Sequence, residues 1–228
     1  LNITAIALAG TNASDFIFAN TGGTACSPLP KAVAAGANCT FTVTFGPTTS
    51  GAKTATVTVT DDNNAVPGST QVTTVNGTGT APLISIAPAT NPFSFGNQNV
   101  GTPTAAQTFT VSNTGTATLN IASISPGGAD AAHYTFTNVG AGSCSPLPKA
   151  VAAGGNCTFT VAFAPTTVGA KNAANITLTD DNNNVAGSTQ VITLNGTATQ
   201  PGFTLSSTSV PDFGSVQVGM TQAATGAG

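Results

Sequence analysis

The stretch CSPLPKAVAAGGNCTFTVAF, residues 144–163, decides the fold, and the chain carries it twice. Residues 26–45 read CSPLPKAVAAGANCTFTVTF and differ at only two of the twenty positions. The closing segment CTFTVAF alternates apolar residues or cysteine with threonine or alanine, which is typical of a strand that buries one face. We therefore expect one face of this strand in a core, formed by Cys157, Phe159, Val161 and Phe163.

The repeat extends on both sides of this stretch. LNITAI at Leu1 corresponds to LNIASI at Leu119, and TDDNNAVPGSTQVTTVNGTGT at Thr60 corresponds to TDDNNNVAGSTQVITLNGTAT at Thr179. Because 144 minus 26 is 118, the period is 118 residues, with one further residue inserted after the cysteines. A period of this length is about the size of one sandwich domain.

Within a period, short runs of β-branched and aromatic residues are bounded by Gly, Pro, Asn and Asp, and helical spacing is nearly absent. This pattern predicts an all-β protein built from antiparallel β-sandwiches. The expected strands of one full period are 83–88, 93–99, 106–113, 118–125, 157–164, 172–180 and 188–196.

The repeat boundaries predict three domains of unequal completeness. Residues 82–199 form a complete domain, whereas residues 1–80 begin at the equivalent of Leu119 and lack the first three strands. Residues 202–228 carry the first strands of a third domain, since FGSVQVGM at Phe213 repeats FGNQNVGT at Phe95.

The composition excludes several kinds of partner. Only 5% of the residues are charged, with four Lys and seven Asp. Nucleic-acid binding and attraction to anionic membranes both need clustered basic residues, which this sequence lacks. No apolar run approaches the roughly 20 residues that span a bilayer, so we expect no membrane insertion in this segment. The sequence does not begin with a charged segment followed by an apolar one, so we expect any signal peptide to have been removed or to lie upstream.

The four cysteines form two pairs of identical spacing, without the histidines or extra cysteines that a zinc site requires. This arrangement predicts disulfides between Cys26 and Cys39 and between Cys144 and Cys157. Disulfides persist in oxidising compartments, so we expect the protein outside the cytosol.

The segments FSFGNQNVGT, QTFTVSNTGTATLNI, CTFTVAFAPTTVGA and VITLNGTAT together resemble the ASH (abnormal spindle, hydin) immunoglobulin-like domain. They are most similar to the version found in tandem in secreted bacterial proteins of the choice-of-anchor D type. The resemblance implies tandem immunoglobulin-like sandwiches related to the major sperm protein and PapD-like folds. It implies a bacterial, extracellular or cell-surface location and no catalytic residues.

Three sets of polar residues are candidates for chemistry. The DDNN segments at Asp61 and Asp180 favour hairpin turns over calcium sites. His133, beside Asp130 and Tyr134, is expected to be an exposed loop residue rather than a base, because the first repeat has Asp15 at its position. The four lysines are expected to be solvated charges near strand ends rather than partner contacts, at Lys31, Lys53, Lys149 and Lys171.

These patterns favour a non-catalytic structural protein that forms a stalk, fibre or filament. The alternative is a cell-surface adhesin or carbohydrate-binding module. Loops that differ between the copies would favour this alternative, but the longest loop, SPLPKAVAAG, is identical in both. We expect no enzyme activity and no cofactor, because no nucleophile, base or metal constellation is present.

The incomplete first domain must be completed by residues outside it, because an open sheet edge and an open core are costly in water. One source is the preceding part of a longer tandem chain, and the other is residues 202–228 of a neighbouring copy. A head-to-tail junction would lack eight residues equivalent to VSNTGTAT, which favours the longer chain. Both predict a fibre in which one copy contributes Phe203, Leu205 and Phe213 to contacts with Ile3, Phe41 or Phe45 of the next.

Overall fold

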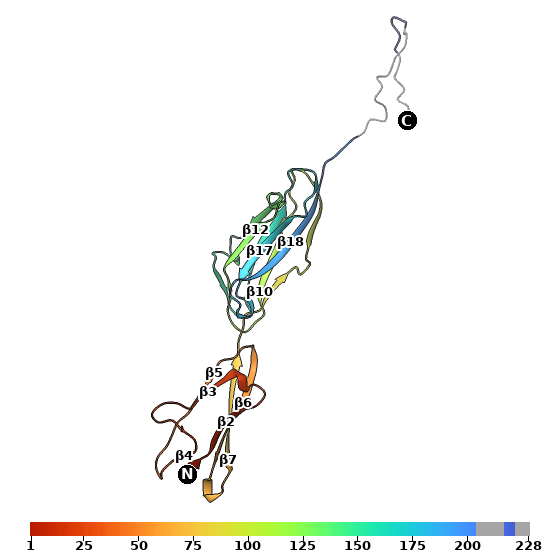
Figure 1. The fold of residues 1–228 in the computed structure, drawn as a ribbon. Helices are drawn as coiled ribbons and strands as arrows, with labels where there is room; N and C mark the ends of the chain where they lie inside the picture. Colours follow the sequence, from red (N-terminus) through yellow and green to blue (C-terminus); the bar gives the residue numbers. More distant parts are fainter. Residues whose placement is uncertain (204–216, 222–228) are drawn as a thin grey trace.

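The computed structural model describes residues 1–203 and 217–221, and these residues form two β-sandwich units (Figure 1). The strands of the first unit lie between Asn2 and Gly79, and those of the second lie between Ile84 and Thr199. No described strand of one unit pairs with a strand of the other. The fold is all-β and immunoglobulin-like, which confirms the fold class expected from the sequence.

The second unit is a sandwich of two main sheets. One sheet has the order β13-β15-β10-β8 and the other has the order β12-β17-β18-β16, with β9 also paired to β18. A small third sheet pairs β11 with β14. The bounds are β8 Ile84–Ala87, β9 Phe93–Asn99, β10 Gln107–Asn113, β11 Leu119–Ile121, β12 Ser123–Gly127, β13 Tyr134–Thr137, β14 Lys149–Val151, β15 Asn156–Phe163, β16 Gly169–Ala170, β17 Ala174–Asp180 and β18 Ser188–Thr199.

All seven strands expected in this unit are present, with two differences. The expected strand at 118–125 is divided into β11 and β12, because Ile121 pairs with β14 whereas Ser123 pairs with β17 in the other sheet. The strands β13, β14 and β16 were not expected. Each has at most four residues, which is too short for alternation to identify from the sequence.

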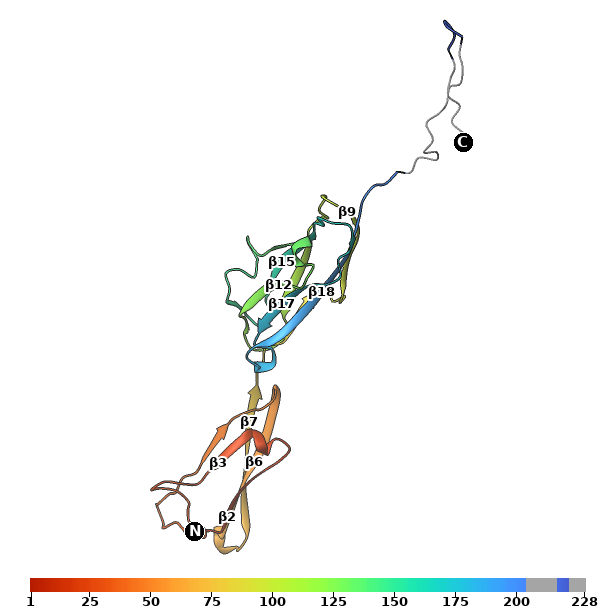
Figure 2. The same cartoon turned by 45° about the horizontal axis from the view of Figure 1, so that its top comes forward.

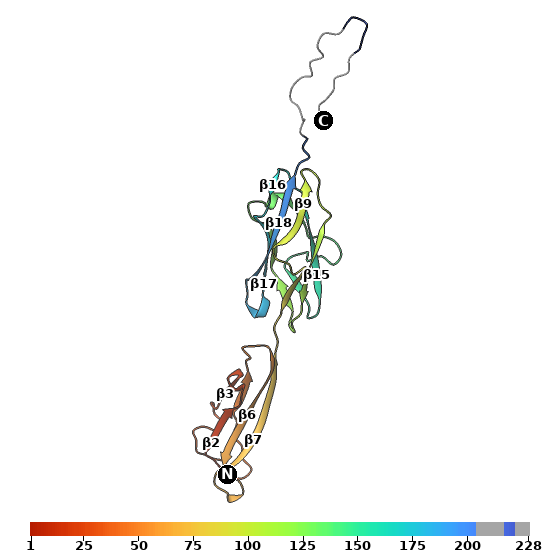
Figure 3. The same cartoon turned by 90° about the vertical axis from the view of Figure 1, so that its right-hand side faces the viewer.

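Among the pairings between described strands, one departs from the antiparallel pattern. Strand β9 runs parallel to β18, with Leu194 opposite Phe93 and Thr199 opposite Asn99. Figures 2 and 3 show β9 lying beside β18 in the second unit. This pairing places β9 along the second half of β18, from Leu194 to Thr199, so that part of its edge is covered.

The core of the second unit lies between its two sheets. The predicted inward face of β15 is confirmed, because Cys157, Phe159, Val161 and Phe163 are at most 1% exposed. They pack against side chains of the opposite sheet, including Ile176, Leu178 and Leu194.

The first unit repeats part of this architecture. Its three sheets are β2-β6-β7, β3-β5 and β1-β4, which correspond by sequence to β12-β17-β18, β13-β15 and β11-β14. The bounds are β1 Asn2–Ile3, β2 Ala5–Ala9, β3 Phe16–Ala19, β4 Lys31–Ala32, β5 Thr42–Phe45, β6 Gly51–Asp61 and β7 Ser69–Gly79. Nothing among the described residues takes the places of β8, β9 and β10 in this unit.

The only helical segments described are four single 3-10 turns: η1 Ala13–Asp15, η2 Asn63–Ala65, η3 Ala131–His133 and η4 Asn182–Asn184. None of them has the length or apolar character needed to cross a membrane.

The two units lie end to end and are joined by one crossing of the chain after β7 (Figure 1). The linker between Gly79 and Ile84 is held by the second unit. The carbonyl of Ala81 accepts hydrogen bonds from Thr116 and Ala117 N–H, and the carbonyl of Leu83 accepts one from Thr114 N–H. Gly79 packs so closely on the first unit that a Cβ there would lie 2.3 Å from the carbonyl oxygen of Thr49. The chain is therefore packed against the first unit at Gly79 and against the second unit from Ala81 to Leu83.

Candidate assembly site

Among the described residues, two edge strands of the first unit lack the second neighbour that their counterparts have in the second unit. In the second unit, β18 pairs with β17 and also with β9, and β15 pairs with β13 and also with β10. Their counterparts β7 and β5 pair, among the described residues, only with β6 and β3. Figure 3 shows β7 at the outer edge of the first unit, without the neighbour that β18 has. The sheets β2-β6-β7 and β3-β5 of the first unit are therefore open on the same side.

Apolar side chains line this open side. Phe41, Val43, Phe45 and Val75 are all half-buried. Their counterparts in the repeat, Phe159, Val161, Phe163 and Leu194, are at most 1% exposed. Since the residues are the same or nearly so, the difference comes from what covers them. We call these four half-buried residues the open face.

Aromatic rings from β9 and β10 cover the equivalent face in the second unit. The ring of Phe109 stacks on Phe159 with centroids 5.4 Å apart, and the ring of Phe95 lies 6.3 Å from Phe163. In the first unit, Phe41 contacts the ring of Phe18, and Phe45 contacts that of Phe16, both from its own β3. The open face thus lacks the ring contacts that β9 and β10 supply.

Gly77 shows that the open face has the packing of a core. A Cβ at this position would lie 2.6 Å from ring carbons of Phe45, and one at Gly196 would lie 2.7 Å from the ring of Phe163. The glycine in the NGT motif therefore makes room for an inward phenylalanine in both units. The phenylalanine of the first unit is positioned as a core residue although one side of it is open.

The structure places the predicted assembly residues in three groups. Phe41 and Phe45 belong to the open face, whereas Ile3 is only 7% exposed and lies within its own unit. Phe203 is 88% exposed. Leu205 and Phe213 lie outside the described residues, as does most of the predicted third domain. The contact between copies therefore stays a prediction.

Both predicted disulfides are present. Cys26 bonds to Cys39, and Cys144 bonds to Cys157, with Cα atoms 5.0 and 4.9 Å apart. The first disulfide closes the SPLPKAVAAG loop of the first unit just before the open-face residue Phe41, and the second closes the same loop of the second unit onto β15. Two disulfides indicate an oxidising environment.

His133 is half-buried, so the expectation of an exposed loop residue was wrong. Its Nδ1 accepts a hydrogen bond from Thr166 N–H at 3.2 Å. In the first unit a carboxylate oxygen of Asp15 accepts from Thr48 N–H at 3.0 Å. The two side chains thus hold the same loop in the two units.

The surroundings of Asp15 also change its ionisation. The backbone N–H of Thr48, the Thr48 hydroxyl and the Lys53 ammonium together hold the pKa of the Asp15 carboxyl below its ordinary value, although burial opposes this effect. In the second unit, burial and the nearby Asp130 raise the pKa of Tyr134 to about 12. Its hydroxyl donates a hydrogen bond to the carbonyl of Lys171.

Two of the four lysines are not solvated, which corrects the expectation for them. The side chain of Lys53 is 10% exposed, and its Nζ lies 3.7 Å from Asp15 Oδ2. Lys171 is 9% exposed, and its Nζ donates to the carbonyl of Val168. Lys53 stabilises the loop at 46–50, which lies beside the junction of the units, and Lys171 stabilises the corresponding loop at 164–168. Because both side chains are largely buried, neither is available to contact a partner.

The DDNN segments form hairpin turns, as expected. Strands β17 and β18 pair up to Asp180 and Ser188, and β6 and β7 pair up to Asp61 and Ser69. A carboxylate oxygen of the first Asp accepts the N–H two residues later in each copy. The described residues contain no group of three or more His, Cys, Asp or Glu side chains suited to a metal ion.

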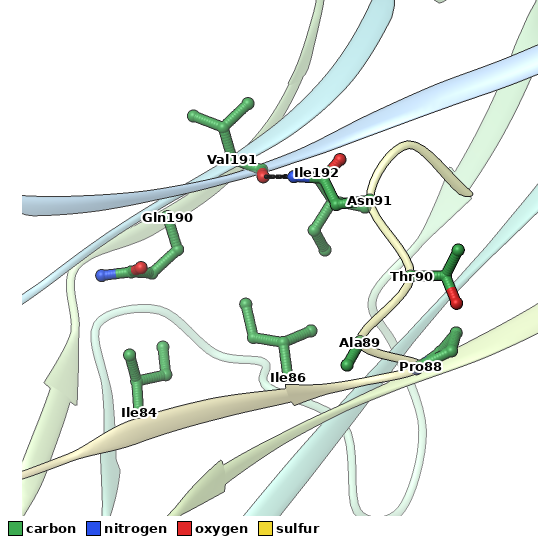
Figure 4. A pocket seen from close by; sticks show the side chains of 9 residues that line it. All are labelled: Ile84, Ile86, Pro88, Ala89, Thr90, Asn91, Gln190, Val191 and Ile192. Atoms are coloured by element: carbon green, nitrogen blue, oxygen red, sulfur yellow. Dashed lines mark hydrogen bonds between the residues drawn. The ribbon is translucent and has the colours of Figure 1, made fainter.

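The second unit has a small cleft of about 190 Å³ between β8 and β18 (Figure 4). Its main polar side chain is already occupied, since Asn91 Nδ2 donates to the carbonyl of Val191 and Asn91 Oδ1 accepts from Thr193 N–H. Asn91 thereby provides hydrogen-bond partners for two backbone groups on the edge of β18, just before β9 begins.

No family model and no curated protein matches this chain. The solved structures with a partial likeness to this chain include three of low sequence identity. A Vibrio cholerae protease, VesB, is 16% identical over 50% of this chain with a TM-score of 0.33, and the chain spans only 31% of the protease. The ASH/PapD-like domain 7 of human CEP192 is 13% identical, with a TM-score of 0.35, over 54% of this chain and 89% of that domain.

The third is a protein of unknown function from Porphyromonas gingivalis W83, at 14% identity and a TM-score of 0.38, over 80% of this chain and 84% of that one. The low TM-scores mean that none of these likenesses carries an argument about function. The functional proposal rests instead on the open face.

Proposed function

We propose that this chain is a non-catalytic, extracellular structural protein whose immunoglobulin-like units join end to end into a stalk, fibre or filament. In this proposal strands from one copy cover the open face of the next. The same pairing between successive units of a longer chain of the choice-of-anchor D type would build the same object.

A single observation supports this proposal: the sheets β2-β6-β7 and β3-β5 of the first unit are open on one side, and that side carries the side chains of a core. An open edge pairs readily with an added strand, and apolar surface gains stability when it is covered. The covering strands need the inward phenylalanines of β9 and β10. Residues 203–219, FTLSSTSVPDFGSVQVG, carry a sequence related to β8 and β9.

The test is hydrogen exchange measured across a range of protein concentration, with sedimentation velocity in parallel. The amides of β5 and β7 should exchange quickly in dilute samples and become protected as larger species form. The amides of β15 and β18 are the internal control, since they are already covered. Equal protection of both pairs of strands in a chain that stays monomeric would contradict the proposal.

A further inference from the structure

The turn η4 of the second unit grips the linker that enters this unit. Asn183 N–H donates to the carbonyl of Pro82 at 2.9 Å, and Asn182 Oδ1 accepts from Ile84 N–H at 3.0 Å. A third bond joins Asn184 Nδ2 to the carbonyl of Thr80 at 3.1 Å. We call this set of contacts the linker clasp.

The first unit contains the same turn, η2, but no linker segment among the described residues is bound to it. Asn64 has a φ of 55° and Ala65 one of 60°, against 55° and 62° for Asn183 and Asn184. Asn63 N–H also bonds to a carboxylate oxygen of Asp61 at 2.8 Å, as Asn182 N–H does to that of Asp180. The turn is exposed, and within residues 1–203 no partner is found for Asn64 N–H or for the Asn63 side chain.

The segment that fits this turn is Thr199–Phe203. Aligned on the repeated NGTxT motif, TQPGF at 199–203 matches TAPLI at 80–84, so Pro201 takes the position of Pro82 and Phe203 that of Ile84. Phe203 is 88% exposed, so little of its side chain is covered.

We infer that the turn Asn63–Ala65 of one copy clasps residues 199–203 of a second copy and so sets the register in which the following strands reach the open face. Asn64 N–H donates to the carbonyl of Pro201, and Asn63 Oδ1 accepts from Phe203 N–H. The inference rests on the proposed end-to-end association and adds the residues that align it.

The one substitution in the turn fits this pairing. Ala65 replaces Asn184, so the bond to the carbonyl of Thr199 is missing. That carbonyl already accepts a hydrogen bond from Val100 N–H at 2.9 Å, whereas the matching carbonyl of Thr80 has only Asn184. The turn of the first unit therefore lacks only the bond to the carbonyl of Thr199, and this carbonyl already has a hydrogen-bond donor in Val100.

The experiment uses a fluorescent peptide of residues 197–219, titrated into the full 228-residue chain and followed by anisotropy. Asn63→Ala removes the acceptor and should weaken binding about five-fold, the usual effect of one hydrogen bond. Asn63→Asp keeps an acceptor oxygen and should bind like the unmodified chain. Asn182→Ala is the matched control, because it alters the filled clasp and should leave peptide binding unchanged.

The outcomes separate the clasp from the function on which it rests. Saturable binding that Asn63→Ala does not weaken overturns the clasp and leaves strand addition supported. No binding by the unmodified chain overturns both the clasp and the second copy as the source of the strands. Unchanged circular dichroism of Asn63→Ala shows that its weaker binding does not come from misfolding.

Discussion

Phe109 stacks on Phe159 with ring centroids 5.4 Å apart, whereas Phe41, the counterpart of Phe159 in the first unit, contacts among the described residues only the ring of Phe18. The two phenylalanines stand in the same repeated segment, CTFTV. A neighbouring strand therefore decides whether this side chain is core or surface.

The first prediction compares these two residues in the dilute, unassociated chain. Phe159→Ala should lower the free energy of unfolding of the second unit by about 3–5 kcal/mol, since it leaves a cavity in a closed core. Phe41→Ala should cost the first unit only about 1–2 kcal/mol, because half-buried contacts are lost. Tyr134 is the only tyrosine and the chain has no tryptophan, so tyrosine fluorescence in urea follows the second unit alone. Hydrogen exchange in β6 follows the first unit, and equal losses would contradict an open face.

The second prediction concerns the disulfides. Each bridge spans 13 residues of sequence and should stabilise its unit by about 3 kcal/mol through the restrained unfolded chain. Replacing Cys144 and Cys157 together by serine should lower the urea midpoint seen by Tyr134 fluorescence. The matching change at Cys26 and Cys39 should leave that signal unaltered. Mass analysis after alkylation without reductant should find no modified cysteine, and four modified cysteines would rule out both bridges.

The third prediction is acid sensitivity of the first unit. Hydrogen bonds hold the pKa values of Asp15, Asp61 and Asp62 below the ordinary value in the folded protein. Their contribution to stability is therefore present above the unfolded pKa of about 4 and is lost as the pH falls below it. Exchange in β6 should accelerate between about pH 5 and pH 2.5 beyond its intrinsic change. Asp15→Asn should make this dependence shallower, and a variant with the full dependence would exclude Asp15 as a contributor.

The fourth prediction is a stiff junction. The linker carbonyls at Ala81, Pro82 and Leu83 all accept hydrogen bonds from the second unit. Small-angle scattering of the dilute chain should fit two units held end to end. Gly115→Val should loosen the junction, since a Cβ there would lie 2.4 Å from the carbonyl oxygen of Ala81. Gly23→Val, where nothing lies within 4 Å of the Cβ, controls for the substitution itself. A scattering curve of freely jointed units for the unmodified chain would be the opposite result.

The strong alternation of CTFTVAF made its strand and inward face predictable, and the duplicated cysteine spacing made the disulfides predictable. The parallel pairing of β9 with β18 was not, because it joins segments about 100 residues apart and leaves no local pattern. The half-buried His133 was missed for a similar reason, since its partner Thr166 lies on another loop. The repeat alone predicts an incomplete first unit, and this division of the chain into domains stays a prediction. The free turn at Asn63 became visible only beside its filled copy at Asn182.

The central claim is that the tail of one copy lies along β7 of the next. In the second unit, Asn195 lies opposite Ser94 in the parallel pair. By the repeat, Asn76 corresponds to Asn195 and Asp212 to Ser94. Partner positions in neighbouring strands are about 4.8 Å apart, which suits a disulfide.

The most direct measurement is therefore oxidation of the double variant Asn76→Cys and Asp212→Cys, followed by a non-reducing gel. The account predicts a ladder of covalent oligomers, because each copy links to one neighbour at each end. Either single variant can give at most a dimer, and Thr70→Cys with Asp212→Cys is the control for register. Monomers closed by an internal bridge, or no ladder beyond that of the register control, would contradict the account.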